Sequence, residues 1–358
     1  MNYNFTITKT ENPKTKPDPN TLKFGQDFTD HMFLMDYSPD KGWHDGRVVP
    51  FAPLSISPAA AVFHYGQEMF EGMKAYRTPD RRVQLFRPYK NAERVNNSAE
   101  RMCMPFMEPD LFVSSIKTLV DIERDWIPEK EGTSLYIRPL MIATDPYLGV
   151  RASDSYLFII ILSPVGPYYD TPGGALVPTK IFVEEGFVRA VTGGVGFAKV
   201  GGNYAASLKV QKLAAEQGCE QVLWLDAFEH SYVEEIGTSN AFFVINDEVI
   251  TPPLGGTILP GVTRNSVILL LKKWGIKISE RKLRISDVAE AAKNGSLQEV
   301  FASGTAAVIS PVGALVYKNE KITISDGNVG KLANRLYDTL YGIQTGTIAD
   351  DMEWTVEV

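Results

Sequence analysis

The sequence is poor in the residues that mark several large classes of protein. Only two cysteines, Cys103 and Cys219, occur in 358 residues, so neither a disulfide framework nor a thiolate metal site is expected, and a reducing compartment is indicated. Basic residues are not in excess, because 36 Lys and Arg stand against 43 Asp and Glu, a formal charge of −7. Nucleic-acid binding needs a basic field, so we expect no nucleic-acid partner.

Long hydrophobic runs are also missing. The longest apolar stretch, YLFIIIL at 156–162, is far shorter than the roughly 20 residues that cross a bilayer, and its β-branched residues favour a buried strand. The first residues have neither the apolar core of a signal peptide nor the Arg-rich, acid-poor composition of a transit peptide. We therefore expect a cytoplasmic protein without a membrane partner.

The length predicts more than one domain. A single core stops growing at roughly 250–300 residues, and this chain has 358. The polar residues 1–20, which include Pro13, Pro17 and Pro19, are expected to form an extended arm. A segment rich in Pro, Gly and Tyr at 166–178 is the best candidate for a linker. We therefore predict an α/β (α+β) fold of two domains, a smaller α+β domain at 21–165 and a larger mixed α/β domain at 179–358.

Hydrophobic periodicity gives the elements of each domain. In the smaller domain it predicts strands at 72–77, 83–86, 134–142 and 156–162, and helices at 88–102 and 110–126. In the larger domain it predicts strands at 180–184, 221–225, 242–245 and 249–251, and helices at 205–217, 263–274, 286–293 and 329–344. Gly218 and Gly275 stand where helices are expected to end.

One lysine, Lys199, lies in a cluster of glycines, GGVGFAKVGGNY at 193–204. A phosphate-binding loop needs Gly before the lysine and Ser or Thr after it, but the neighbours are Ala198 and Val200. A dinucleotide fingerprint that starts at Gly194 would need glycine at position 199. Two interpretations remain at this point: a flexible surface loop, or a lysine that forms a Schiff base with an aldehyde cofactor.

Seven ordered motifs decide between them: HYGQEMFEGMKAY (64–76), LFRPYKNAERV (85–95), LYIRP (135–139), AKVGGNY (198–204), EEIGTSN (234–240), ILPGVTR (258–264) and ASGTAAVISP (302–311). In order and spacing the chain resembles the branched-chain amino acid aminotransferases of pyridoxal-phosphate fold type IV over nearly its whole length after the arm. The resemblance implies the two-domain fold of that type, with the cofactor in the larger domain and no metal.

The resemblance implies that pyridoxal 5'-phosphate is the cofactor and Lys199 the catalytic lysine that carries it and moves the proton from the substrate Cα. Tyr204 would bind the phenolic oxygen of the cofactor, and Glu235 its pyridine nitrogen. A carboxylate at that nitrogen stabilises the cationic ring that withdraws electrons from Cα. Taken alone, Glu235 could equally be a solvated acid at a strand end.

The resemblance also implies a set of groups around the cofactor phosphate: Arg94, Thr238, Val262, Thr263 and Thr305. The fork of an arginine suits a dianion. Val262 and Thr263 stand at an expected helix start, where free N–H groups attract anions. Without the resemblance, Thr263 would more simply be a helix cap and Arg94 part of a solvated helix face.

Substrate contacts are implied on the smaller domain. Tyr136 and Arg138 are two apart on an expected strand, so their side chains leave the same face. The resemblance places Tyr136 beside the substrate α-carboxylate, together with the N–H groups of the turn at Thr305 and Ala306, and Arg138 at the distal carboxylate of glutamate. Phe70 and Tyr65 would line the apolar pocket, although aromatic residues there are more often plain core.

The implied reaction is the reversible transfer of an amino group from leucine, isoleucine or valine to 2-oxoglutarate, ping-pong through pyridoxamine phosphate. The partners are thus small amino acids and 2-oxo acids. A D-amino acid aminotransferase or an aminodeoxychorismate lyase of the same fold type is the nearest alternative, and a noncatalytic pyridoxal-phosphate or nucleotide carrier a more distant one. The family also implies a homodimer, with the loop at 148–150 reaching the site of the second subunit.

Overall fold

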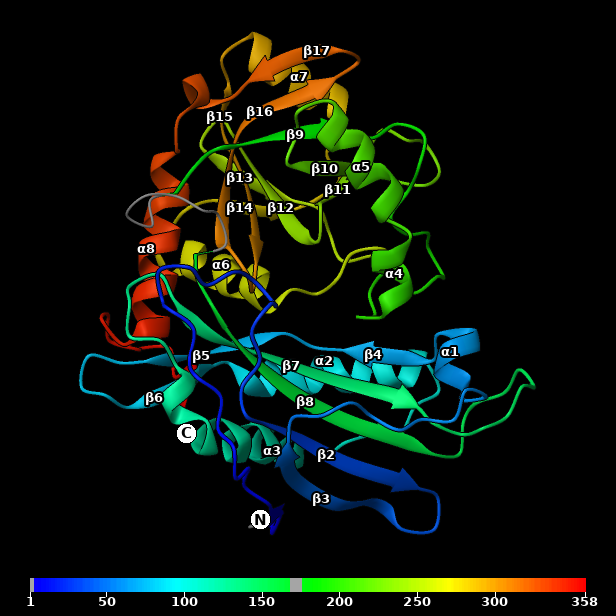
Figure 1. Ribbon diagram of the computed structural model, residues 1–358. Helices are drawn as coiled ribbons and strands as arrows, with labels where there is room; N and C mark the ends of the chain where they lie inside the picture. The colour runs from blue at the N-terminus through cyan, green and yellow to red at the C-terminus, as the bar shows by residue number, and fades with distance from the viewer. Residues whose placement is uncertain (1–2, 168–175) are drawn as a thin grey trace. The chain divides into compact units, whose positions relative to one another are not determined.

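Two β-sheets, one in each of two units of the chain, organise the computed structural model, which describes residues 3–167 and 176–358 (Figure 1). Unit 1 comprises the described residues up to 167 together with 198–201 and 342–358, and unit 2 comprises the described residues of 176–197 and 202–341. Most of the expected linker at 166–178 lies outside the described residues. The division expected from the sequence therefore stays a prediction.

The sheet of unit 1 has the strand order β1-β3-β2-β8-β7-β5-β6-β18, with β4 paired to β7. Its strands are β1 (Thr6–Ile7), β2 (His31–Ser38), β3 (Gly42–Pro50), β4 (Glu68–Phe70), β5 (Met73–Arg77), β6 (Val83–Phe86), β7 (Ser134–Ala143), β8 (Tyr156–Val165) and β18 (Thr355–Glu357). The long antiparallel pair β7 and β8 lies at its centre, and nearly all side chains of both strands are buried.

Helices cover one face of this sheet (Figure 1). α3 (Pro109–Ile122) packs on β2 and β8, and α2 (Pro88–Arg101) packs on α3 and on β4. Both helices begin with proline, whose missing N–H costs nothing at a helix start. Phe33, Phe112 and Phe158 meet between α3 and the sheet. The short α1 (Ala61–Tyr65) precedes β4.

The N-terminal residues, which were expected to form an extended arm, are joined to the core of unit 1. β1 pairs in parallel with β3, and the Phe5 ring lies 4.9 Å from that of Phe33. Farther along, the Thr10 amide donates to His31 Nε2 at 2.8 Å. Because Nε2 accepts this hydrogen bond, the ring N–H of His31 is on Nδ1. This N–H faces the buried carboxylate of Glu123.

The sheet of unit 2 has the strand order β11-β10-β9-β16-β15-β12-β13-β14, with β17 on β16. β11 also pairs with β12, so the strands β11-β10-β9-β16-β15-β12 form a closed ring. The strands are β9 (Thr179–Val183), β10 (Gln221–Leu225), β11 (Val233–Ile236), β12 (Ser239–Ile245), β13 (Glu248–Thr251), β14 (Ile278–Glu280), β15 (Leu297–Gly304), β16 (Val308–Tyr317) and β17 (Glu320–Thr323).

Both faces of this second sheet are buried. On β10, Val222 and Trp224 pack with Val210 and Ala214 of α5 (Leu208–Glu216). Leu223 and Leu225 point the other way, into the core shared with α7 (Ile285–Lys293). This alternation follows from the two-residue period of a strand. The remaining helices are α4 (Gly201–Ala205), α6 (Val262–Lys273) and α8 (Lys331–Thr345).

The described residues can be compared with the features that composition disfavoured, which are membrane spans, metal sites and disulfides. None of the described helices combines the length and apolarity that a membrane span requires. Within residues 3–167 and 176–358, no group of three His, Cys, Asp or Glu side chains is arranged to hold a metal ion. Cys103 is exposed and Cys219 is buried, and both are free thiols.

Candidate active site

Unit 1 presents one face of β4 and β7 that carries several of the expected site residues. Tyr136 and Arg138 alternate on β7 with Leu135 and Ile137, which are fully buried. Phe70 of β4 lies opposite Leu140 of β7 and therefore shares the face of Tyr136 and Arg138. The expected common face is thus present in the structure.

Arg138 has aromatic neighbours and no ion-pair partner in the part of the chain that the structure describes. Its guanidinium carbon lies 4.8 Å from the Phe70 ring centroid and 5.3 Å from that of Tyr136. Nη2 donates to Tyr136 Oη at 3.1 Å, and the buried Nε has no hydrogen-bond partner among the described residues. No carboxylate in residues 3–167 and 176–358 lies within 4.0 Å of this guanidinium. A permanent salt bridge within these residues therefore does not hold Arg138.

The Lys199 backbone is fixed to the same unit at three points. The Lys199 amide donates to Ser98 Oγ of α2 at 2.9 Å, and the Lys199 carbonyl accepts from the Phe70 amide at 3.0 Å. Two residues later, the Gly201 amide donates to the Glu68 carboxylate. Nζ of Lys199 lies 4.9 Å from the Phe70 ring centroid. Lys199 and Arg138 therefore both approach the Phe70 ring.

Arg94 forms a buried two-point ion pair with Glu71. Arg94 Nε and Nη2 donate to the two carboxylate oxygens at 2.7 and 2.8 Å, and Asn91 Nδ2 donates to Glu71 Oε2 at 2.9 Å. Burial raises the pKa of Glu71, but the Arg94 charge outweighs burial and holds the pKa below its usual value. Arg94 is therefore a fixed guanidinium in the interior, not part of a solvated helix face.

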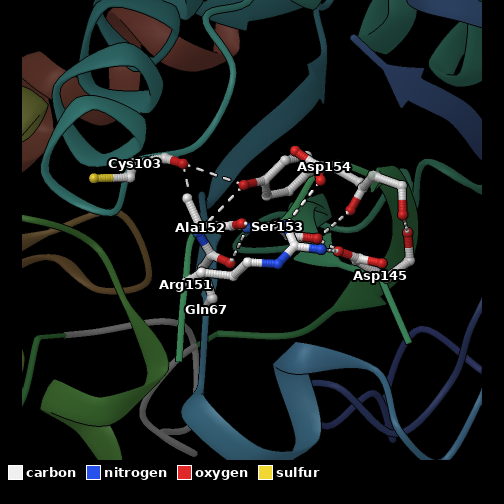
Figure 2. A network of polar contacts seen from close by, with 10 residues as sticks. Gln67, Cys103, Asp145, Arg151, Ala152, Ser153 and Asp154 are labelled. Atoms are coloured by element: carbon white, nitrogen blue, oxygen red, sulfur yellow. Dashed lines mark hydrogen bonds and ion pairs between the residues drawn. The ribbon is translucent and has the colours of Figure 1, made fainter. Parts of the chain in front are cut away.

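Tyr65 is linked to an exposed loop between β7 and β8. Its hydroxyl donates to the Leu148 carbonyl. Figure 2 shows how the base of the loop is held: Arg151 pairs with Asp145 and with Asp154 at 2.5 and 2.7 Å. At the same base, the Ser153 amide donates to Gln67 Oε1 at 3.1 Å (Figure 2). The loop tip is apolar and exposed, with Val150 85% accessible.

In unit 2, Glu235 is a buried carboxylate surrounded by donors. It lies on β11, and its Oε1 accepts from Asn240 Nδ2 and from the Leu259 amide, both at 3.0 Å. Arg189 Nε lies 2.9 Å from Glu235 Oε2. The neighbouring Glu234 alternates to the other face of β11, where burial raises its pKa and Thr257 Oγ1 donates to it at 2.5 Å. Glu235 is therefore not a solvated strand-end acid.

Asn240 connects Glu235 with the start of α6. Its amide also donates to the Leu259 carbonyl at 2.9 Å, and a side chain at Gly261, the residue before α6, would clash with it. Val262 and Thr263 form the first turn of α6, and Thr263 is buried. Free N–H groups at such a helix start attract anions.

Three other expected residues lie in turns next to this cluster. Thr238 is exposed in the tight turn between β11 and β12. Thr305 and Ala306 form the turn between β15 and β16. The two turns are neighbours, because a side chain at Gly304 would lie 2.8 Å from Ser239 Oγ. Unit 2 thus brings Glu235, the start of α6 and both turns together.

Tyr204 belongs to α4, directly after the glycine-rich segment. Three residues further on, Ser207 donates through Oγ to the Tyr204 carbonyl at 2.7 Å. Asn203 Nδ2 donates to the Val195 carbonyl at 2.9 Å, so α4 is fixed to the glycine segment that precedes it. Arg189 is joined to the same segment through the Gly196 carbonyl at 2.9 Å.

Reasoning from the sequence missed several groups of the site. Glu71, Ser98, Arg189 and Asn240 hold the expected residues in place. Glu71 stands inside the motif FEGMKAY, and a buried acid among apolar residues could have been noticed there. Nothing in the local pattern marks Arg189, because its partner Glu235 is far away in the sequence.

Comparisons with known proteins give a consistent result. Residues 68–315 match the family model of amino-transferase class IV. The chain is 56% identical to branched-chain-amino-acid aminotransferase 2 of Bacillus subtilis over 98% of this chain and 96% of that one. It is 53% identical to branched-chain-amino-acid transaminase 1 of the same organism over 100% of both. A solved branched-chain amino acid aminotransferase from Escherichia coli has a TM-score of 0.73 and 26% identity, covering 91% of this chain and 98% of that one.

A second solved structure carries a ligand. The T.th. branched-chain amino acid aminotransferase with pyridoxamine 5'-phosphate has a TM-score of 0.73 and 25% identity. The match covers 91% of this chain and 97% of that one. The fold of this chain is therefore shared with these enzymes over most of its length.

Proposed function

Since this chain belongs to the amino-transferase class IV family, we propose that it reversibly transfers the amino group of leucine, isoleucine or valine to 2-oxoglutarate. The relatives named for branched-chain amino acids, at more than half identity over nearly the full length, support this substrate class. A D-amino acid aminotransferase and an aminodeoxychorismate lyase are less well supported, because none of the relatives compared above carries such a name.

The observation that carries the proposal is the environment of Arg138. A substrate pocket for this reaction must accept an aliphatic side chain and the carboxylate of glutamate in turn. Arg138 lies against the Phe70 and Tyr136 rings and has no ion-pair partner among the described residues. The rings offer apolar surface to leucine, and the guanidinium offers a charge to glutamate. We assign Tyr65 to the wall of the same pocket.

The residues present fit pyridoxal 5'-phosphate. Its pyridine nitrogen requires a carboxylate, which the buried Glu235 would supply, and Tyr204 would bind the phenolic oxygen. The phosphate requires cationic and N–H donors: Arg94 of unit 1 would supply the charge, and the first turn of α6 in unit 2, at Val262 and Thr263, would supply N–H groups. When bound, the group supplies an aldehyde that accepts the amino group and a ring that stabilises negative charge at the substrate Cα.

The remaining contacts belong to the two turns of unit 2. Thr238 and Thr305 would donate hydroxyl groups to the phosphate, and the amides of Thr305 and Ala306 would bind the substrate α-carboxylate with the Tyr136 hydroxyl. Backbone N–H groups in a turn suit this task because they are rigid and form a concave donor surface for anions. Lys199 would move the proton between the substrate Cα and atom C4′ of the cofactor. Its backbone hydrogen bonds fix the position of the Cα that carries this side chain.

We also propose a homodimer in which the loop at 148–150 reaches the site of the second copy. The ion pairs of Arg151 hold the base of this loop while its apolar tip is exposed, and buried apolar surface stabilises association. The cytoplasmic location expected from the sequence stays a prediction.

A panel of amino donors tests the substrate class directly. With 2-oxoglutarate as acceptor, we expect L-leucine, L-isoleucine and L-valine to give kcat/KM values at least about tenfold above those of D-alanine and D-leucine, since one pocket discriminates by its fit to the transition state. Preference for the D-amino acids, or release of pyruvate from aminodeoxychorismate, would support the alternatives instead.

A further inference from the structure

Gln67 lies between α1 and β4, two residues after Tyr65. Its side chain is 9% exposed, and its amide forms hydrogen bonds on two sides (Figure 2). On one side, Oε1 accepts from the Ser153 amide at 3.1 Å. On the other side, Nε2 donates to the Met102 carbonyl at 3.0 Å. Gln67 therefore joins the loop 144–155, between β7 and β8, to the interior of unit 1.

The groups to which Gln67 donates are themselves held in place. Met102 is the residue that follows the last turn of α2. Gln67 Nε2 also donates to the hydroxyl of the buried Tyr156 on β8, at 3.2 Å. Burial raises the pKa of Tyr156 to about 12, so this hydroxyl keeps its proton and donates to the Cys103 carbonyl at 3.1 Å. The Gln67 amide cannot turn without losing buried hydrogen bonds, which is costly.

The loop 144–155 has two limbs and an exposed tip. On the first limb, the Asp145 carbonyl accepts from the Ala61 amide at 3.2 Å. The second limb is held to the interior by the Gln67 side chain. At the tip, the Leu148 carbonyl accepts from the Tyr65 hydroxyl. The short segment that contains α1 and Gln67 therefore contacts the loop at both limbs and at the tip.

On the basis of the proposed function, we infer that Gln67 is a positioning residue for substrate binding: it holds the second limb of the loop, and the loop holds Tyr65 in the wall of the apolar pocket. Tyr65 is exposed, so the hydrogen bond from its hydroxyl restrains its ring more than packing does. A wall that is ordered before the substrate arrives costs less ordering on binding. The apolar end of leucine should depend on this wall, whereas the distal carboxylate of glutamate should depend on Arg138.

Two unreactive ligands separate these two ends. 4-Methylpentanoate has the branched end of leucine, and glutarate has the second carboxylate of glutamate. We would measure their dissociation constants for the holoenzyme by calorimetry in the wild type, in Gln67→Met and in the control Gln84→Met. Methionine has nearly the length of glutamine but no amide. Gln84 of β6 is also buried, and it donates to the Ile343 and Gln344 carbonyls at 2.9 and 3.0 Å.

We expect Gln67→Met to weaken 4-methylpentanoate binding by at least about fivefold, because Tyr65 must then be ordered as the ligand binds, and to leave glutarate binding within about twofold. Gln84→Met should change neither constant, although it also removes two buried hydrogen bonds. Unchanged binding of 4-methylpentanoate to Gln67→Met would overturn the inference, and so would equal weakening of both ligands.

A double-mutant cycle tests the route through Tyr65. Tyr65→Phe removes the hydroxyl that donates to the Leu148 carbonyl and keeps the ring. In this background, Gln67→Met should weaken 4-methylpentanoate binding by less than about twofold, because changes that act through one contact are not additive. Hydrogen exchange at the Ser153 amide should also be faster in Gln67→Met. Effects of the two substitutions that simply multiply, or unchanged exchange at Ser153, would contradict this role.

The outcomes distinguish this inference from the proposed function. If the wild-type holoenzyme bound neither ligand, the substrate class itself would be wrong. If it bound both and Gln67→Met behaved like Gln84→Met, only the role of Gln67 would be wrong. A Gln67→Met variant that did not fold would be recognised from its circular dichroism. Gln67→Asn, which keeps an amide in the interior on a side chain too short to span both sides, would then carry the comparison.

Discussion

Glu71 fixes the position of Arg94, the cation that the family resemblance implies at the cofactor phosphate. Its carboxylate is fully buried and receives donors from Arg94, Asn91 and the Gly72 amide. A carboxylate that receives two N–H donors from one guanidinium fixes both the place and the orientation of that guanidinium. Arg94 can therefore meet a phosphate group without first being ordered.

Glu71→Gln should weaken the binding of pyridoxal 5'-phosphate and destabilise unit 1. The substitution leaves the buried Arg94 guanidinium beside a neutral amide, and removal of one partner of a buried ion pair costs roughly 3–5 kcal/mol. Equilibrium dialysis measures the cofactor affinity, and thermal unfolding of the apoprotein measures the stability. The control is Glu93→Gln on α2, the helix that carries Arg94. Glu93 is an exposed carboxylate that pairs with Lys90. If both variants bound the cofactor equally well, Glu71 would have no positioning role.

The sequence named residues whose chemistry is visible in a motif, such as Lys199, Glu235 and Arg138, and the structure gives each of them a buried or fixed setting. It could not name Arg189, the ion-pair partner of Glu235, because the choice of partner depends on packing between distant segments. The aromatic setting of Arg138 depends on packing in the same way.

At the scale of elements, Asn240 joins β12 to the loop before α6. Asn240→Ala should lower the free energy of unfolding by about 1–3 kcal/mol, because the buried Glu235 and Leu259 oxygens each lose a donor. Cofactor affinity should also fall, since α6 begins next to this residue. Denaturant unfolding with and without pyridoxal 5'-phosphate measures both effects. Asn334→Ala on α8, where the amide donates to an exposed Asp338, is the control, and equal behaviour of the two variants would contradict this role.

Local patterns predicted some elements well. The strand predicted at 221–225 coincides with β10, because both of its faces are apolar and the flanking residues Glu220 and Asp226 are charged. The helix predicted at 205–217 corresponds to α5, which begins later, at Leu208, and the short α4, which ends at Ala205, was not predicted. The helix predicted at 110–126 ends at Ile122 and is followed by a 3-10 turn, where Trp126 Nε1 donates to Asp30 at 3.0 Å.

Strands stabilised by distant partners were harder to predict. β2, β3, β15 and β16 were not expected, although they pair over most of their lengths. β3 is half-exposed and contains two glycines and a proline, which are weak strand formers. Its pairing with β2 and β1, not its own propensity, makes it a strand.

At the scale of the whole molecule, the exposed loop at 148–150 predicts self-association. Val150→Asp should leave the thermal stability of the chain nearly unchanged, because Val150 is 85% accessible, but it should weaken the dimer by placing a charge in an apolar contact. Sedimentation velocity over a range of protein concentrations measures this. Val150→Ala is the conservative control, and a dimer that resists Val150→Asp would exclude the loop from the interface.

The central claim is that Lys199 carries a cofactor through which leucine donates its amino group. The most direct measurement is the visible absorption of the holoenzyme on adding L-leucine alone and then 2-oxoglutarate, with borohydride trapping and peptide mapping of the reduced group. We expect the band to bleach with leucine and return with 2-oxoglutarate, and the trapped group to lie on Lys199. A band that leucine leaves unchanged, or a group mapped to Lys209 or Lys212, would contradict the account.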